Sequence, residues 1–210
     1  MSQNQGLVGS GTTAVGVPDG QFQFVRLGRY NDQIVSELQA RFYELCYRKL
    51  LFKSFSSAQT LSVAGTAMTG HILWNGATNV NLVPIMISLQ VSVTSATMTG
   101  IGLGSTAAGA QTTAPTTTTG VTKSGNCFLG GVAPQAIPYT VATTLATTTD
   151  IQLLHNTAAI NTVGVDQIDI YLDGKIIVPQ NTAICLTALG AASAASAVTS
   201  TIYWAEISAL

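Results

Sequence analysis

The sequence predicts an all-β protein, a jelly-roll sandwich or barrel preceded by an N-terminal arm and one α-helix. Short apolar runs rich in β-branched and aromatic residues recur after residue 55, with turn residues between them. No part of the chain alternates strands with helices, so a parallel sheet is not expected. The one convincing helical periodicity lies before residue 55, and 210 residues are enough for a single sizeable core.

The first 55 residues are expected to form an attachment segment distinct from the jelly roll. Residues 1–20 are polar, rich in glycine and without periodicity, which is typical of a mobile arm. A helix is predicted from about Asn31 to Lys49, where apolar residues recur every three or four positions. We therefore divide the chain into 1–55, arm and helix, and 56–210, the jelly-roll domain.

The remaining strands follow from alternation and turn signals. They are predicted at 59–63, 68–74, 79–93, 127–129, 151–155, 165–172, 175–178, 183–189 and 199–207. Pro84 predicts a bulge or an edge position, and Asp173-Gly174 predicts a hairpin turn between two of these runs. The glycines at 100–104 are interpreted as close packing at a strand end, and 104–125 as a long exposed loop.

Charge is scarce and unevenly placed. Charged residues make up 8% of the chain, against about 25% in an average domain, and Lys123 is the only one between residues 54 and 149. Such a surface is either hydrated through hydroxyl and amide groups or covered by sister subunits or a larger assembly, and we favour the second. The net charge of −1 without a basic run argues against nucleic acid as a partner. The longest apolar tract, 80–93, is interrupted by polar residues, which argues against a membrane.

The sequence offers no constellation for catalysis, and neither a cofactor nor a metal is predicted. His71 and His155 are the only histidines, and each is expected to form hydrogen bonds in or beside the sheet. Glu206 is isolated in the last strand. Asp169 and Asp173 share a strand face and leave a cation site open as an alternative, although a turn and a hydrated carboxylate explain them better.

The three cysteines and the aromatic residues complete the candidates. Cys46, Cys127 and Cys185 are far apart and odd in number, which indicates buried thiols in a protein made in a reducing cytoplasm. Tyr203 and Trp204 must point to opposite faces of one strand, so one serves the core. The other is an interface anchor or covers the edge of the core. The interface candidates are Trp74, Tyr203 and Trp204.

Four segments together resemble a known family. They are His71-Ile72-Leu73-Trp74-Asn75-Gly76, Asn81-Leu82-Val83-Pro84-Ile85-Met86, Asp173-Gly174-Lys175-Ile176-Ile177-Val178-Pro179 and Tyr203-Trp204-Ala205-Glu206-Ile207. Over roughly 59–207 the chain resembles structural proteins of tailed bacteriophages with a tumour-necrosis-factor-like jelly roll. Those proteins often have Pro-Pro-Gly where this chain has Val178-Pro179-Gln180-Asn181, which leaves the subfamily open.

The resemblance implies a homotrimer on the outer surface of a virion. We expect a non-enzymatic cement (decoration) protein that stabilises an icosahedral capsid at threefold or quasi-threefold junctions, with the major capsid protein as its partner. The cations that would pair with acidic capsid loops are Arg26, Arg29, Arg41, Arg48, Lys49 and Lys53, unless they only solvate the helix. The alternative is a head fibre or spike that binds a host receptor or glycan, with 104–125 as the place to look.

Overall fold

The computed structural model describes residues 42–63, 67–93, 100–116, 123–142, 144–156, 167–189 and 197–209. The chain divides into two units, Met1–Arg41 and Phe42–Leu210, and only the second is described below. The predicted arm, the predicted helix up to residue 41 and the candidate residues Arg26, Arg29 and Arg41 therefore lie outside the described residues.

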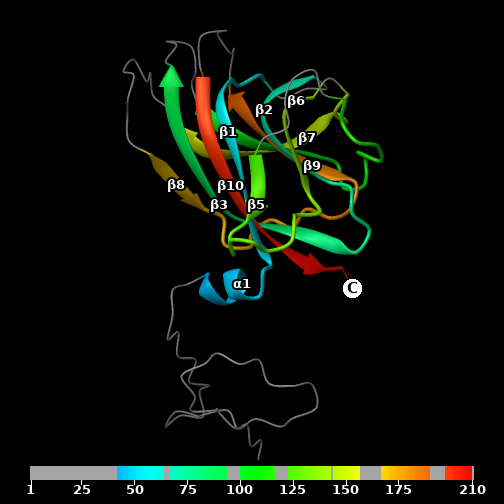
Figure 1. Cartoon of the computed structure of the whole chain (residues 1–210). Coiled ribbons are helices and arrows are strands. Elements are labelled where there is room, and N and C mark those ends of the chain that lie inside the picture. The colour runs from blue at the N-terminus through cyan, green and yellow to red at the C-terminus, as the bar shows by residue number, and fades with distance from the viewer. Residues whose placement is uncertain are drawn as a thin grey trace, which may run out of the picture. The chain divides into compact units, whose positions relative to one another are not determined.

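The described part is built almost entirely of strands (Figure 1). Its elements are α1 (Tyr43–Tyr47), β1 (Leu51–Thr60), β2 (Met68–Asn75), β3 (Val80–Val93), β4 (Gly100–Thr106), β5 (Lys123–Asn126), β6 (Ile137–Ala142), β7 (Thr148–Asn156), β8 (Ile168–Tyr171), β9 (Thr182–Leu189) and β10 (Ala197–Ser208). No helix in this part is long and apolar enough to cross a membrane.

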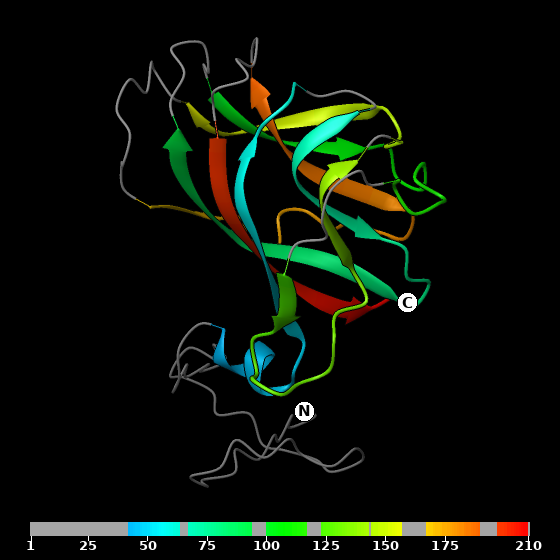
Figure 2. The same cartoon turned by 45° about the horizontal axis from the view of Figure 1, so that its top comes forward.

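The strands form two five-stranded sheets that face each other (Figure 2). The first sheet has the order β5-β1-β10-β3-β8 and the second the order β6-β2-β9-β4-β7. All pairings between these strands are antiparallel. Without β5 and β6, the orders β1-β10-β3-β8 and β2-β9-β4-β7 are those of an eight-stranded jelly roll. The predicted fold class is confirmed, and β5 and β6 add one edge strand to each sheet.

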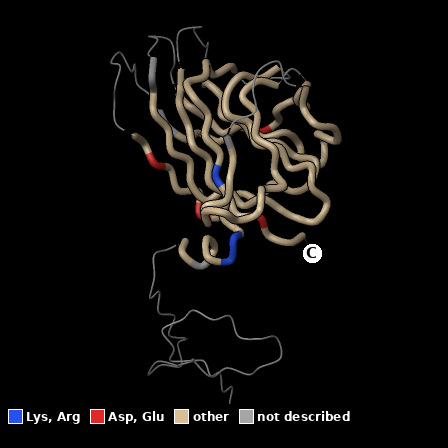
Figure 3. The backbone as a smooth tube through the Cα atoms, in the orientation of Figure 1, with Lys and Arg blue, Asp and Glu red and all other residues tan. Residues whose placement is uncertain are grey.

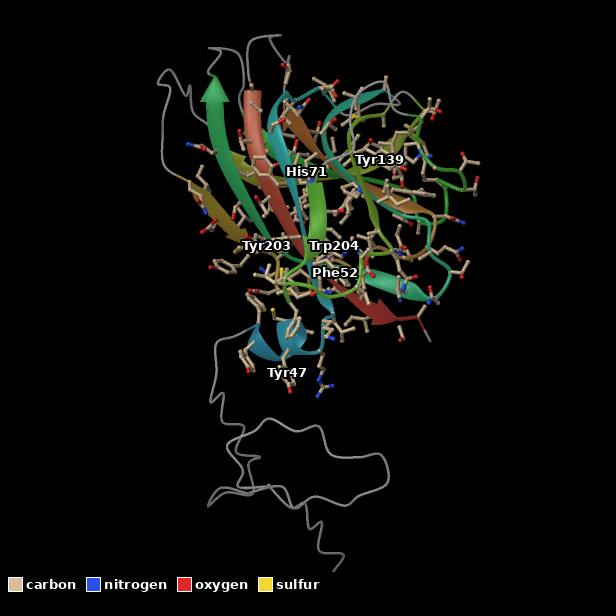
Figure 4. All side chains as sticks on the ribbon, viewed as in Figure 1. Tyr47, Phe52, His71, Tyr139, Tyr203 and Trp204 are labelled. Carbon is tan, nitrogen blue, oxygen red and sulfur yellow. The ribbon has the colours of Figure 1, made fainter. Side chains whose placement is uncertain are left out.

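The core lies between the sheets and is supplied by alternate residues of each strand. In β10, Ile202 and Trp204 point inward and are fully buried, whereas Tyr203 lies half-buried on the outer face. Trp204 stacks on Phe52 of β1 with ring centroids 6.1 Å apart. Both aromatic rings lie low in the sandwich in Figure 4. The prediction that only one of Tyr203 and Trp204 serves the core is thus confirmed.

Several predicted boundaries were wrong. Strand β1 begins at Leu51, so the division expected between residues 55 and 56 falls inside a strand. Residues 127–129, predicted as a strand, form a turn after β5. The glycines at 100–104 belong to strand β4, which was not predicted. The missing β-carbon of Gly102 leaves room for two neighbours, since a Cβ there would lie 2.9 Å from both Ile151 and Leu189.

Asp173-Gly174 makes a tight turn but not a hairpin. Both residues have positive φ, 51° and 74°, and the Lys175 amide donates to the Leu172 carbonyl at 3.0 Å. The runs on either side do not pair with each other. Tyr171 pairs with Met86, and Val178 pairs with Leu82, so both runs follow β3 in the same direction. The turn therefore connects two segments that both pair with β3.

Pro84 marks a bulge, as its lack of a donor predicts. It lies in β3, a strand with neighbours on both sides, at the point where the register between β3 and β10 shifts. The Ile85 carbonyl then accepts the amides of Leu172 at 2.8 Å and Asp173 at 3.2 Å, which keeps the interrupted strand paired.

Candidate functional site

A buried histidine links the two sheets. His71 of β2 contacts Ser54 of β1 through Nε2 at 2.7 Å and Ser200 of β10 through Nδ1 at 2.8 Å. Figure 4 labels His71 inside the sandwich. A neutral imidazole has one donor and one acceptor nitrogen, so one serine donates and the other accepts. The prediction that His71 forms hydrogen bonds in the sheet is confirmed. The side chain of His155 is outside the described residues.

This serine–histidine–serine chain contains residue types that occur in catalytic sites, but its side chains are not accessible to a substrate. All three side chains are at most 3% exposed. Burial lowers the pKa of His71 from 6.5 to about 3, so the imidazole stays neutral near neutral pH. A nucleophile must reach its substrate, and neither serine does so in this packing. We therefore assign the chain of hydrogen bonds to the structure of the core.

Buried hydrogen bonds of Trp74, Asn75 and Gln111 fix one end of the sandwich. The Asn75 amide donates to the carbonyls of Val80 at 2.9 Å and Val178 at 3.0 Å. Trp74 donates from Nε1 to the Gln111 carbonyl at 3.0 Å. Gln111 in turn accepts the Ala146 amide. Trp74 is thus largely buried within its own subunit, and its assignment as an interface anchor stays a prediction.

The same contacts involve the chain after β4, which was predicted as an exposed loop. Gln111 and Pro115 are buried, and the backbone amide of Gln111 donates to the Asn181 carbonyl at 2.8 Å. Of the predicted loop 104–125, residues 104–106 belong to β4 and 123–125 to β5. Within 107–116 only Gln111 and Pro115 are buried, and the other residues are exposed. Residues 117–122 lie outside the described part.

Glu206 is a structural anchor. Its carboxylate is 5% exposed and accepts the backbone amides of Gln135 at 2.8 Å and Ala136 at 3.0 Å, together with Nε1 of Trp204 at 3.2 Å. These bonds tie the last strand to the segment that precedes β6. The aromatic-x-Glu pattern of the C-terminal strand therefore has a physical reason within one subunit. Trp204 is fully buried in the core of one subunit, and its assignment as an interface candidate stays a prediction.

The acidic candidates do not converge. Asp169 is exposed and accepts hydrogen bonds from Gln167 at 2.9 Å and from Ser88. These two bonds lower its pKa, so it carries charge. Asp173 occupies the turn after β8. No group of three or more His, Cys, Asp or Glu side chains that could hold a metal ion occurs among the residues described.

The outer face of the first sheet carries a band of large side chains. We call Lys53, Phe55, Met86, Tyr171 and Tyr203 the aromatic sheet face. Register places Lys53 beside Tyr203, Tyr203 beside Met86 and Met86 beside Tyr171 across four strands. Phe55 and Tyr171 are 47% and 48% exposed, which is unusual for aromatic rings of a monomer. Tyr203 is the one interface candidate that keeps an accessible ring.

A second apolar surface lies at the end of the sandwich that carries α1. We call Tyr43, Tyr47, Phe128, Leu129 and Val132 the base surface. Tyr43 and Tyr47 stack with ring centroids 5.9 Å apart, and Lys49 Nζ lies 5.2 Å from the Phe128 centroid. Leu129 and Val132 are 85% and 65% exposed. Figure 4 labels Tyr47 on α1, pointing away from the sheets.

Three of the described cations, Arg48, Lys49 and Lys53, lie at or beside the same end, whereas Lys175 lies in the turn after β8. Arg48 and Lys49 follow α1, and Lys53 is exposed on β1. Figure 3 shows these blue segments against a sandwich that is otherwise nearly uncharged. The structure thus brings three of the six predicted contact residues close to the base surface, whose apolar members the sequence did not reveal.

The comparisons with known proteins identify nothing. No family model matches the chain, and neither a curated protein nor a solved structure is detectably similar to it. The function is therefore argued from the residues described above.

Sequence reasoning missed the base surface because loop residues have no periodicity. Leu129 and Val132 lie between β5 and β6, where nothing in the pattern says which side chains face water. The prediction for the cysteines holds only in part. Cys185 is buried, whereas Cys46 and Cys127 are half-buried.

Proposed function

We propose that this chain is a non-enzymatic structural subunit, a homotrimeric cement protein that attaches to the outer surface of a tailed-phage capsid. One observation carries the proposal. The polar side chains best suited to chemistry are buried in hydrogen bonds of the core, whereas large apolar side chains are exposed at several places, including the aromatic sheet face, the base surface and the edge strand β7. Exposed apolar patches of this kind favour association with other proteins.

The aromatic sheet face is the surface that we assign to self-association. Tyrosine and phenylalanine are enriched at subunit contacts because they bury a large area at small entropic loss. A closed ring of identical subunits requires each copy to present two different patches. The second patch is supplied by Ile151 and Leu153, which are 43% and 56% exposed on the edge strand β7. The number three is taken from the resemblance to phage jelly-roll proteins.

The base surface is the part that we assign to the shell. Its apolar side chains would bury area against capsid subunits, while Arg48 and Lys49 would pair with acidic loops. Binding only to the assembled shell stabilises that shell by mass action against disassembly. The alternative, a spike that binds a host receptor or glycan, would use the same trimer with a different attached end.

Two sets of variants test the two surfaces separately. Light scattering of the purified full-length protein should give a trimer. The double variant Tyr171→Ser, Tyr203→Ser should be monomeric. Leu129→Ser, Val132→Ser should remain trimeric but fail to sediment with emptied phage capsids. A wild-type monomer would refute the self-association, and full capsid binding by the base variant would refute the attachment. Staining of host cells by a fluorescent fusion, without binding to capsids, would favour the spike.

A further inference from the structure

Two of the three cysteines meet in one cluster on the outer side of the first sheet. Cys46 lies on α1 and Cys127 directly follows β5, and both pack against the buried side chains of Leu51, Ile85 and Ala205. The rest of this cluster is apolar and partly buried. Neither cysteine is bonded in the structure, and each is half-buried rather than enclosed.

Backbone bonds hold the two cysteine-bearing segments together independently of the thiols. The Cys127 amide donates to the Leu51 carbonyl at 2.9 Å. The side-chain amide of Asn126 donates to the Lys49 carbonyl at 2.7 Å. The segment that carries Cys127 is therefore anchored at two points to the chain that immediately follows α1. These bonds, and the packing of both cysteines against one buried cluster, bring together two segments that about 80 residues of chain separate.

The electrostatic surroundings of Cys127 agree with this placement. Burial raises its pKa, the nearby Lys53 ammonium lowers it, and Cys46 raises it again. The effect of Cys46 on Cys127 agrees with their shared place in one apolar cluster. Cys185 differs, because burial raises its pKa to about 12 and its Sγ lies 3.7 Å from the Gly104 carbonyl inside the second sheet. It provides an internal control.

We propose that Cys46 and Cys127 form a dithiol site that small-molecule disulfides oxidise to an intramolecular disulfide. A thiolate of the pair attacks one sulfur of the reagent disulfide, so that a mixed disulfide forms and one reagent thiolate leaves. The second protein thiolate attacks the protein sulfur of the mixed disulfide and releases the second reagent thiolate. The two protein thiols lose two protons and two electrons, and the reagent disulfide is reduced to two thiols.

The bond would fasten α1 to the connection between β5 and β6. Both parts carry members of the base surface, so oxidation would fix the relative positions of the Tyr43–Tyr47 pair and the 128–132 segment. The thiols would stay reduced in a reducing cytoplasm and would oxidise in an environment where disulfides persist. This inference concerns the chemistry of the site and stands whether or not the chain binds a capsid.

The test is incubation of the full-length protein with oxidised glutathione at pH 8, followed by alkylation and mass spectrometry without reductant. The wild type should lose two of its three free thiols, gain no glutathionyl group and yield a linked pair of peptides containing Cys46 and Cys127. Cys185→Ser should behave in the same way. Cys46→Ser and Cys127→Ser should each carry one glutathionyl group on the remaining partner. The oxidised wild type should melt roughly 5–10 °C higher than the reduced form.

Three outcomes would overturn the proposal, and the wild type alone suffices to reveal them. They are a stable glutathionyl adduct without a cross-link, a disulfide between two chains on a non-reducing gel, and a bond that includes Cys185. Failure of capsid binding would leave the peptide map unchanged, so this result is separable from that of the proposed function.

Discussion

The buried His71 should make the protein lose stability in mild acid. Its pKa is about 3 in the folded state and 6.5 as a free side chain. Above pH 6.5 the imidazole is neutral in both states and contributes no pH dependence. Below pH 6.5 the unfolded chain takes up a proton that the folded chain cannot accept until about pH 3. The free energy of unfolding therefore falls as the pH is lowered through this window.

The magnitude follows from the two pKa values. Each pH unit well inside this window removes about 1.4 kcal/mol, so lowering the pH from 7.5 to 4.5 should remove roughly 2–3 kcal/mol. The matched variant is His71→Gln, whose amide offers one acceptor and two donors to Ser54 and Ser200 but does not titrate. It should be less stable than the wild type at pH 7.5 and lack this component of the pH dependence.

The assay is urea unfolding of both proteins at equal concentration from pH 7.5 to pH 4.5. The other titratable groups are common to both proteins, so their contributions cancel in the difference between them. The stability difference between wild type and variant should narrow by roughly 2–3 kcal/mol between pH 7.5 and pH 4.5. Parallel curves would refute the reasoning, because His71 would then be protonated at no cost and the space between the sheets would not be closed.

Three further substitutions test the roles assigned to single side chains by urea unfolding. Glu206→Gln should cost about 1–3 kcal/mol, because Oε2, which accepts the Gln135 backbone amide at 3.1 Å, is replaced by a donor and the bonds to Oε1 lose their carboxylate acceptor. Gln135→Ala should be neutral, since only the backbone of Gln135 is bound to Glu206. Equal losses of stability in the two variants would contradict the anchoring role of the carboxylate. Trp204→Ala should lower the free energy of unfolding by about 3–5 kcal/mol, because this ring is buried in the core. Tyr203→Ala should lower the stability of one subunit clearly less, because its ring lies on the outer face. The reverse order of the two losses would contradict the orientation of β10. Gly174→Ala should cost about 1–2 kcal/mol from positive φ alone, since the nearest atom to its Cβ would be 3.7 Å away, and a neutral result would show that the turn relaxes.

The sequence by itself determined those features that depend on neighbouring residues. Alternation along a strand placed Tyr203 and Trp204 on opposite faces before any partner was known. The lack of a donor at Pro84 predicted a bulge or an edge position, and the bulge is what forms. Asp173-Gly174 predicted a hairpin, of which only the tight turn forms. These features are local, because a period of two residues and the shape of a turn do not depend on what packs against them.

The tertiary structure decided which groups meet across the chain. His71 contacts a serine 129 residues away, and Glu206 binds amides about 70 residues away, because the order of strands in the sheets brings them together. Strand β4 escaped prediction since glycine is a poor strand former, and only the side chains of Ile151 and Leu189 explain why Gly102 belongs there. Only the tertiary structure likewise brings together the residues of the two exposed surfaces, and Cys46 with Cys127. Alternation along a strand predicts whether a side chain points inward or outward, but the order of strands in the sheets decides which other side chains it contacts.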